Sequence, residues 1–238
     1  MCSILFSNKP VSADKYNLLK LRGPDATTSR SIAGYNFVHN LLSLTGEYTE
    51  QPICKDDIVL LFNGEIYNYK DLDISAKSDS YSIISAYKKY GPEFVKQLDG
   101  EYAFVLVDIK QQLILFSTDV FKTKPLFYSI EHGYIGISTF STPLQTLGFD
   151  TIIRAKPNTC YKIDLISNSI NEIIIKEFDL NQYKTSYDDW IAAFELSIKK
   201  RAYQSGDMKT FIGLSSGYDS GAIAVSYTHL TLPTILRV

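Results

Sequence analysis

Residues 57–69 read DIVLLFNGEIYNY, and this stretch carries the strongest structural signal in the sequence. Residues 58–62 are all apolar, and such a β-branched and aromatic run is typical of a buried strand. The next two residues, Asn63 and Gly64, form the pair most favoured in a tight hairpin turn. The stretch therefore predicts a buried strand that ends in a turn at Asn63–Gly64.

The segments around this strand predict a strand-rich chain. CSILF, at residues 2–6, is a further candidate for a buried strand. Three later segments alternate as hairpins do: residues 101–119, turning near Lys110–Gln111; residues 124–139, turning near His132–Gly133; and residues 159–178. These segments indicate a sheet-based core.

One helix is predicted among these strands, over residues 79–91 (DSYSIISAYKKYG). Asp79 or Ser80 provides its cap and Gly91 its end, and three bulky side chains recur at helical spacing: Tyr81, Ile84 and Tyr87. Strands covered by helices indicate an α+β layered domain.

The pattern changes near residues 180–185. Residues 186–204 predict an amphipathic helix, with Ser186 as a plausible cap and Trp190, Ala193, Phe194, Ser197, Ile198 and Arg201 on one face. KTFIGL, at residues 209–214, predicts a short buried strand, and SSGYDSG follows it directly. This order is how a nucleotide-binding α/β domain begins. We therefore expect one domain over residues 2–180 and the start of another over residues 183–225.

The last residues do not fit that second domain. VSYTHLTLPTILRV, at residues 225–238, contains β-branched threonines and Pro233 and predicts a poor helix. The segment also resembles the translated end of a transposon adaptor used in preparing sequencing libraries. We expect residues 226–238 to be a non-native tail on a longer natural protein; the alternative is a native, divergent tail.

Composition narrows the function classes. The 238 residues carry a net charge of −2, which gives no basic field for nucleic acid. The sequence shows no apolar run near the ~20 residues of a membrane span and no secretory signal. Three scattered cysteines are not a disulfide framework, so we expect reduced thiols and a cytoplasmic setting.

Cys2 is the first candidate for chemistry. Removal of Met1 would place a thiol and a free α-amine on one residue. A terminal amine has a pKa of about 7.7–8.0, so it can act as general base for its own side chain. Alone, a cysteine at this position is weak evidence, and the alternative is a frayed end without a role.

Three further side chains suit the same chemistry. The Asn63 amide and the Gly64 N–H can stabilise an oxyanion formed during acyl transfer, and Gly64 lets a substrate approach without a Cβ. Glu65 and Asp79 offer carboxylates for a substrate ammonium. Taken singly, Asn63–Gly64 is also a hairpin turn and Asp79 a helix cap.

The order of short blocks along the chain resembles the class II glutamine amidotransferase domain of asparagine synthetases over about residues 2–175. The blocks are MCSI (1–4), RGPD (22–25), HNLLS (39–43), QP (51–52), NGEIYNY (63–69), SD (78–79), LDGEYAFVLVD (98–108) and TDVFKTKPLFY (118–128). The resemblance implies an N-terminal-nucleophile hydrolase fold of four αββα layers, with two antiparallel sheets between helices.

The resemblance also implies residue roles. Cys2 attacks the glutamine carboxamide, Asn63 and Gly64 hold the oxyanion, and glutamate and ammonia leave without a cofactor. Glutamine is then bound by Glu65 and Asp79 at its α-amino group, by the backbone of Leu42 and Ser43, and by Arg22, which shapes the site with Asp25.

The loop SSGYDSG resembles the SGGxDS pyrophosphate loop of ATP pyrophosphatases, with Ser216 in place of a glycine. The resemblance implies ATP contacts from Leu214, Ser215, Gly217, Asp219 and Ser220, and an Mg²⁺ contact from Asp219. The full-length enzyme would then amidate aspartate, or a related carboxylate, with ATP and Mg²⁺. It could also form a homodimer. A relative of the β-lactam-forming synthetases is an alternative.

Some positions depart from the family pattern. Leu41 stands where the family has an arginine for the glutamine α-carboxylate, and a charge-assisted bond of that kind contributes roughly 1.5–3 kcal/mol. Arg22 or Arg30 could substitute. Otherwise the domain is a degenerate glutamine-binding module without efficient hydrolysis. Thr118 and Lys122 also replace an arginine and a glycine. We expect a structural role for His39, and none in chemistry for Cys54 and Cys160.

Overall fold

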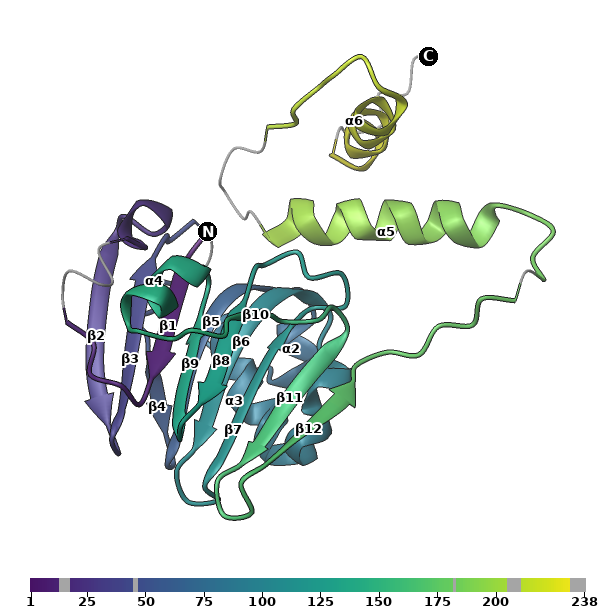
Figure 1. The fold of residues 1–238 in the computed structure, drawn as a ribbon. Coiled ribbons are helices and arrows are strands. Elements are labelled where there is room, and N and C mark those ends of the chain that lie inside the picture. The colour runs from purple at the N-terminus through teal and green to yellow at the C-terminus, as the bar shows by residue number, and fades with distance from the viewer. Residues whose placement is uncertain (13–17, 45–46, 182, 205–210, 232–238) are drawn as a thin grey trace, which may run out of the picture. The chain divides into compact units, whose positions relative to one another are not determined.

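The computed structural model describes residues 1–12, 18–44, 47–181, 183–204 and 211–231 (Figure 1). By its internal contacts the chain divides into two compact units, residues 1–43 with 47–177 and residues 44–46 with 178–238. The first unit contains every strand of the described residues, and the second contains two helices.

The first unit is built on two six-stranded sheets (Figure 1). Sheet 1 has the order β10-β8-β9-β1-β3-β2, with β1 (Ser3–Ser7), β2 (Ala26–Ile32), β3 (Tyr35–Leu41), β8 (Phe127–Glu131), β9 (Tyr134–Ser138) and β10 (Ile153–Arg154). Sheet 2 has the order β12-β11-β7-β6-β5-β4, with β4 (Ile53–Lys55), β5 (Ile58–Ile66), β6 (Gly100–Asp108), β7 (Leu113–Thr118), β11 (Thr159–Asp164) and β12 (Ser169–Ile174). All neighbouring strands are antiparallel, which confirms the expected pair of antiparallel sheets.

Alternation along the strands creates three apolar layers. Ile4 and Phe6 of β1 meet Val59 and Leu61 of β5 between the sheets. Leu5 faces the other way, onto a cluster with α4 (Ser141–Thr146). The outer face of sheet 2 packs on α3 (Asp79–Tyr90) and the 3₁₀ helix η2 (Gly91–Gln97). The unit therefore has the four αββα layers that were expected. Two short elements complete it, η1 (Lys20–Arg22) and α2 (Tyr69–Leu72).

The predicted hairpins and the predicted helix are confirmed. β6–β7, β8–β9 and β11–β12 are hairpins, and His132 and Gly133 both have positive φ at the second turn, as a two-residue hairpin loop requires. Helix α3 ends at Gly91, whose φ is 59°. The predicted turn at Asn63–Gly64 is wrong. Strand β5 continues through both residues to Ile66 because β6 pairs with it along this whole length.

The second unit contains α5 (Asp188–Gln204), which confirms the predicted amphipathic helix, and α6 (Tyr218–Thr231). The predicted strand at 209–214 is wrong for residues 211–214, which form no strand; residues 209 and 210 lie outside the described residues. A strand needs a paired neighbour, and this unit has none among its described residues.

The predicted poor helix over residues 225–238 is wrong as far as Thr231, where α6 ends. One reason is that the hydroxyl of Thr228 donates to the Ala224 carbonyl at 2.8 Å, which satisfies a polar group inside the helix. Residues 232–238 lie outside the described residues, and the origin of the tail stays a prediction. No helix in the described ranges has the length and apolar character needed to cross a membrane.

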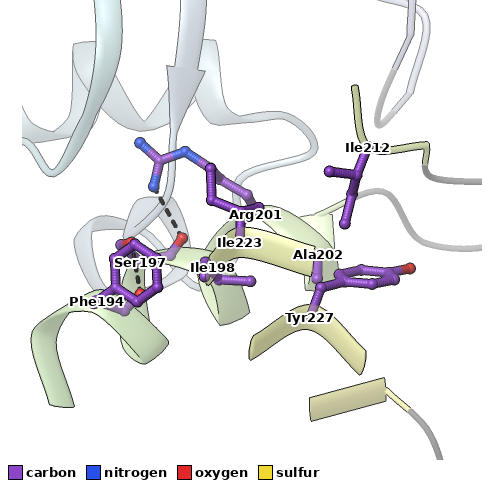
Figure 2. A pocket seen from close by; sticks show the side chains of 8 residues that line it. All are labelled: Phe194, Ser197, Ile198, Arg201, Ala202, Ile212, Ile223 and Tyr227. Atoms are coloured by element: carbon purple, nitrogen blue, oxygen red, sulfur yellow. Dashed lines mark hydrogen bonds between the residues drawn. The ribbon is translucent and has the colours of Figure 1, made fainter. Parts of the chain in front are cut away.

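A cavity of about 320 Å³ lies within the second unit (Figure 2). Helices α5 and α6 and the segment before α6 line it with Phe194, Ser197, Ile198, Arg201, Ala202, Ile212, Ile223 and Tyr227. Arg201 stands at this cavity with Nη1 donating to the Ser197 carbonyl at 2.9 Å. The two helices thus leave a mainly apolar space between them.

Candidate active site

Cys2 directly precedes β1, and its alternation with the strand turns it toward the space between the two sheets. Ser3 pairs with Asn40 in β3, so the register continues with Cys2 opposite Leu41. Cys2 shares its face of the strand with Ile4 and Phe6 of the inter-sheet core. Its thiol rests on the backbone of Leu42: Sγ accepts from the Leu42 N–H at 3.4 Å and donates to the Leu42 carbonyl at 3.6 Å.

The RGPD turn holds the backbone on both sides of this thiol. Arg22 Nε donates to the Cys2 carbonyl at 2.9 Å, and its guanidinium carbon lies 5.3 Å from the centre of the Phe140 ring. Asp25 Oδ2 accepts from the Ser43 N–H at 2.8 Å. The structure thus places Arg22 on the backbone of Cys2; a contact between Arg22 and glutamine stays a prediction.

Asn63 and Glu65 project from β5 toward the same inter-sheet space. They share the face of Val59 and Leu61, which belong to the inter-sheet core. Asn63 is buried, and neither Nδ2 nor Oδ1 has a hydrogen-bond partner among the described residues. An unpaired buried amide costs roughly 1–3 kcal/mol, so it is the kind of group that a ligand would satisfy.

The hydrogen-bond pattern of β5 shows where the backbone of Gly64 points. Tyr67, directly after β5, donates to the Asp99 carbonyl at 2.7 Å. In an antiparallel pair the bonded residues alternate, so odd-numbered residues of β5 bond to β6. Tyr102, opposite Gly64, instead uses its own N–H and carbonyl for Asp119. The Gly64 N–H therefore points away from β6, toward the other edge of β5.

The backbone N–H groups on either side of Gly64 along that edge donate to side chains. The Phe62 N–H donates to Gln51 Oε1 at 2.6 Å, and the Ile66 N–H donates to Asp79 Oδ2 at 3.0 Å. The Gly64 N–H lies between these two bonds, close to the Asn63 amide. The chain thus presents two adjacent donors, one from a side chain and one from the backbone.

The structure gives a packing reason for the glycine at position 64. A Cβ there would collide with the Glu101 carbonyl oxygen and with Tyr102 of β6. The close approach of two strands therefore requires glycine, and the expectation that Gly64 makes room for substrate stays a prediction. Gly100 on β6 is required for the same reason, because a Cβ there would collide with the Glu65 carbonyl oxygen.

Asp79 opens α3 and reaches back to β5. The predicted cap at Asp79 or Ser80 is wrong by one residue, because the helix begins at Asp79 and Ser78 is the cap position. Asp79 Oδ1 accepts its neighbour's N–H, from Ser80, at 2.7 Å. Burial, and then the nearby Glu65 carboxylate, raise the pKa of Asp79 to about 7. Two carboxyl groups this close together are suited to a cation such as an ammonium.

The Cys2 thiol needs a base to become a nucleophile. Burial is the largest effect and raises the pKa of this thiol; the charges of Glu65 and Asp79 raise it further, while the Leu42 hydrogen bond lowers it. Met1 precedes this residue in the sequence and has about half of its surface exposed (51%). Removal of Met1 would leave the base on Cys2 itself.

The structure shows where Leu41, which replaces the family arginine, and Arg30, a candidate substitute for it, lie relative to Cys2. Leu41 is buried and presents no charge beside Cys2. Arg30 pairs with Phe37, four residues along β2 from Ala26, which is the partner of Leu41; that separation is roughly 13 Å. Arg30 therefore lies in the far half of its strand from Cys2.

The structure also describes His39, Lys122 and the two remaining cysteines, which the sequence analysis had singled out. His39 is buried against the Phe62 carbonyl at 3.3 Å, and burial lowers its pKa to about 4, so it is neutral and structural. Lys122 has a φ of 54°, a conformation that favours glycine. Cys160 is buried and Cys54 exposed.

The loop before α6 lies in the second unit. The hydroxyls of Ser215 and Ser220 meet at 2.9 Å, and Gly217 N–H donates to Ser215 Oγ at 3.2 Å. Leu214 is exposed, as is Asp219 in the first turn of α6. Among the described residues, no group of three His, Cys, Asp or Glu side chains could hold a metal ion. An Mg²⁺ held through Asp219 would need phosphate and water oxygens as its other ligands.

The sequence analysis missed two features that surround the candidate site: Gln51 and an ion pair. Gln51, which fixes the Phe62 amide, stood in the QP block without a role, and only the strand register reveals one. Lys124 and Glu101 form an ion pair of 3.4 Å between the loop after β7 and β6. Their separation in the sequence gave no signal of this contact.

Comparisons with known proteins identify the family of this domain. Residues 1–174 match the protein family described as "Glutamine amidotransferase domain". A putative asparagine synthetase (glutamine-hydrolyzing) 1 of Methanocaldococcus jannaschii is 32% identical over 222 residues, covering 81% of this chain and 40% of that protein. Asparagine synthetase (glutamine-hydrolyzing) 1 of Saccharomyces cerevisiae is 28% identical over 230 residues, covering 91% of this chain and 40% of that protein.

Among solved structures, a glutamine phosphoribosylpyrophosphate amidotransferase from B. subtilis aligns with a TM-score of 0.56 at 14% identity, covering 97% of this chain and 64% of that one. This likeness supports the fold alone. The chain spans about 40% of the length of the curated relatives. The family match covers the two sheets and the residues gathered around Cys2, and over residues 1–174 this chain belongs to the glutamine amidotransferase domain family.

Proposed function

We propose that Cys2, once Met1 has been removed, hydrolyses the side-chain amide of glutamine to glutamate and ammonia. The observation that carries this proposal is the pair of adjacent donors beside a partly buried thiol: the Asn63 amide, which has no hydrogen-bond partner in the part of the chain that the structure describes, and the edge N–H of Gly64. Donors fixed in advance where an oxyanion forms supply a large part of the catalysis of acyl transfer.

The steps follow from the groups present. The Cys2 α-amine takes the thiol proton, directly or through a water, and Sγ attacks the carboxamide carbon. Asn63 Nδ2 and the Gly64 N–H stabilise the oxyanion. The protonated amine then returns its proton to the leaving nitrogen, and ammonia departs from a thioester. Water, deprotonated by the same amine, releases glutamate and restores the thiol. No cofactor takes part.

Glu65 and Asp79 would bind the α-ammonium of glutamine. Asp79 has a pKa of about 7 in the free protein, so the arriving ammonium favours its ionised form. The Leu42 and Ser43 backbone, fixed by Cys2 and Asp25, would line the side of the pocket next to the thiol.

The ammonia would serve an ATP-dependent amidation of aspartate or a related carboxylate in the longer protein. Support comes from the names of the relatives and from the loop at residues 214–220. The hydroxyls of Ser215 and Ser220, with the Gly217 amide, converge at the N-terminus of α6, which suits phosphate. Leu214 would contact the nucleotide, and Asp219 would share Mg²⁺ with the phosphates.

The test is glutamate release by the purified chain, with loss of Met1 verified by mass spectrometry. We expect turnover in the absence of ATP and metal, and none from a Cys2→Ala variant. A chain that lacks Met1 and binds glutamine, yet releases no glutamate, would refute the proposal in favour of a binding module.

A further inference from the structure

A lysine whose side chain is largely shielded from solvent lies beside the site and has no part in the steps above. Lys124 follows β7 in the loop that leads to β8, and its side chain is only 12% exposed. Its Nζ lies 3.4 Å from Glu101 Oε2 on β6, and its charge acts on the terminal amine next to Cys2. Removing an ammonium from water is costly, so a lysine this buried needs compensating partners.

The strand register places this cation next to the carboxylates of the site. Glu101 pairs directly with Glu65, one residue pair along from Gly64–Tyr102. Directly opposed side chains of an antiparallel pair have Cβ atoms about 5 Å apart, so both carboxylates face the inter-sheet space together. Lys124 therefore brings one positive charge to Glu101, the direct strand partner of Glu65.

The loop that carries Lys124 is fixed on both sides. Buried Asp119 accepts from the N–H groups of Phe121 at 2.9 Å and Thr123 at 3.0 Å. After Lys124, the Leu126 carbonyl accepts from Ala155 at 2.9 Å. A charge on such an anchored backbone is preorganised for a ligand.

The substrate class requires a cation here. Glutamine carries its ammonium and its carboxylate on one carbon, so the groups that bind them must also be close neighbours. Glu65 and Asp79 supply the anionic side. On the cationic side, Arg22 is turned onto the Cys2 carbonyl and the Phe140 ring, and Leu41 is apolar.

We infer that Lys124 binds the α-carboxylate of glutamine, with Glu101 orienting its ammonium group. The inference rests on the proposed function, since it assumes that glutamine occupies the space in front of Cys2. A lysine that only neutralises the two opposed glutamates is the structural alternative. The two roles differ in one respect: only the first depends on the carboxylate of the substrate.

The experiment compares two substrates in matched variants of the chain after loss of Met1. The substrates are L-glutamine and 4-aminobutanamide, which is glutamine without its α-carboxylate, and ammonia release gives kcat/KM for each. The variants are Lys124→Met and Lys124→Gln, with Lys122→Met as a control of equal charge change in the same loop. Thermal unfolding verifies that each variant is folded, and the second substitution serves if the first does not fold.

We expect both Lys124 variants to lose about 10- to 150-fold in kcat/KM for glutamine, mainly through KM, and less than about threefold for 4-aminobutanamide. Lys122→Met retains the wild-type preference for glutamine. Equal losses on both substrates, or no loss on either, would overturn the inference.

A second measurement separates this inference from the proposed function. If the wild-type chain releases no ammonia, the proposed function fails, and calorimetry on Cys2→Ala then decides the role of Lys124. Glutamine binding that disappears on adding Lys124→Met would leave the inference standing. Binding that is unchanged, or absent from the start, would overturn it.

Discussion

Replacing Asp79 by asparagine should strengthen the fold at alkaline pH while weakening glutamine binding. The pKa of this carboxyl rises from its ordinary value of 3.8 to about 7 in the folded chain, first through burial and then through Glu65. A difference of about 3 units corresponds to about 4 kcal/mol between the protonated and ionised forms.

The direction in which the free energy of unfolding changes with pH follows from the linkage between protonation and folding. The folded chain binds this proton more tightly than the unfolded chain, so the free energy of unfolding falls as the pH rises from about 4 to about 7. Above that range the full cost of about 4 kcal/mol persists. Asparagine removes the charge and keeps one oxygen acceptor, at a cost of about 1–2 kcal/mol for the other hydrogen bond. The net gain at pH 8 is then about 2–3 kcal/mol.

Urea unfolding of both proteins at pH 5 and pH 8 measures this gain. We expect Asp79→Asn to be the more stable at pH 8 and to lose the stability difference between the two values of pH. Asp73→Asn is a suitable control, because hydrogen bonds from Ser75 and Ser85 lower the pKa of Asp73 to about 2. This carboxyl is ionised at both pH 5 and pH 8, so its replacement should leave the wild-type pH dependence unchanged. An unchanged pH slope in Asp79→Asn would refute the reasoning.

The ionisation of Asp79 should also control how tightly glutamine binds. Below pH 7 the protonated Asp79 no longer attracts an ammonium, so KM should rise about tenfold between pH 8 and pH 6 as the ionised fraction falls. In Asp79→Asn we expect a high KM that does not change over this range. Steady-state glutaminase assays at several pH values test both statements.

Three further outcomes are expected. Gly64→Ala should lower the free energy of unfolding by about 3 kcal/mol, measured by urea unfolding, because its Cβ would meet the Glu101 carbonyl. Lys122→Gly should raise that free energy by about 0.5–1 kcal/mol by relieving a φ of 54°, and an unchanged melting curve would contradict this. Cys2→Ala and a chain that retains Met1 should both release no ammonia, yet unfold within about 1 kcal/mol of the processed wild type.

Local patterns in the sequence were sufficient for much of the sheet scaffold. The hairpin at His132–Gly133 follows from turn chemistry, and α3 follows from helical spacing up to Gly91. The same rules failed at Asn63–Gly64, where the pair most favoured for a turn lies inside a strand. Pairing with β6 overrides the local preference there, because the glycine meets the backbone of a strand almost forty residues later in the chain.

The grouping of Cys2, Asn63, Glu65 and Asp79 was predicted only through resemblance to a family. Contacts such as the one between Lys124 and Glu101 depend on the register of β6 and the course of a loop. No period or spacing in the sequence encodes either. The missing strand at residues 211–214 has a related cause, since pairing decides whether a strand forms.

The donor site also depends on how strand β4 ends. β4 pairs with β5 only from Ile58 to Leu60, and Phe62, the next residue of β5 whose N–H points to this edge, donates to the Gln51 side chain instead of to a strand. An open strand edge normally invites pairing with another chain.

Two side chains protect this edge in place of a strand, Gln51 on the Phe62 amide and Asp79 on the Ile66 amide. They leave the Gly64 amide between them, next to the buried Asn63 side chain. Under the proposed function, the groups that prevent edge pairing would also define where the substrate oxygen binds. For this reason Gln51→Ala should reduce the turnover of glutamine, measured as ammonia release, although the Gln51 side chain is engaged with the Phe62 amide.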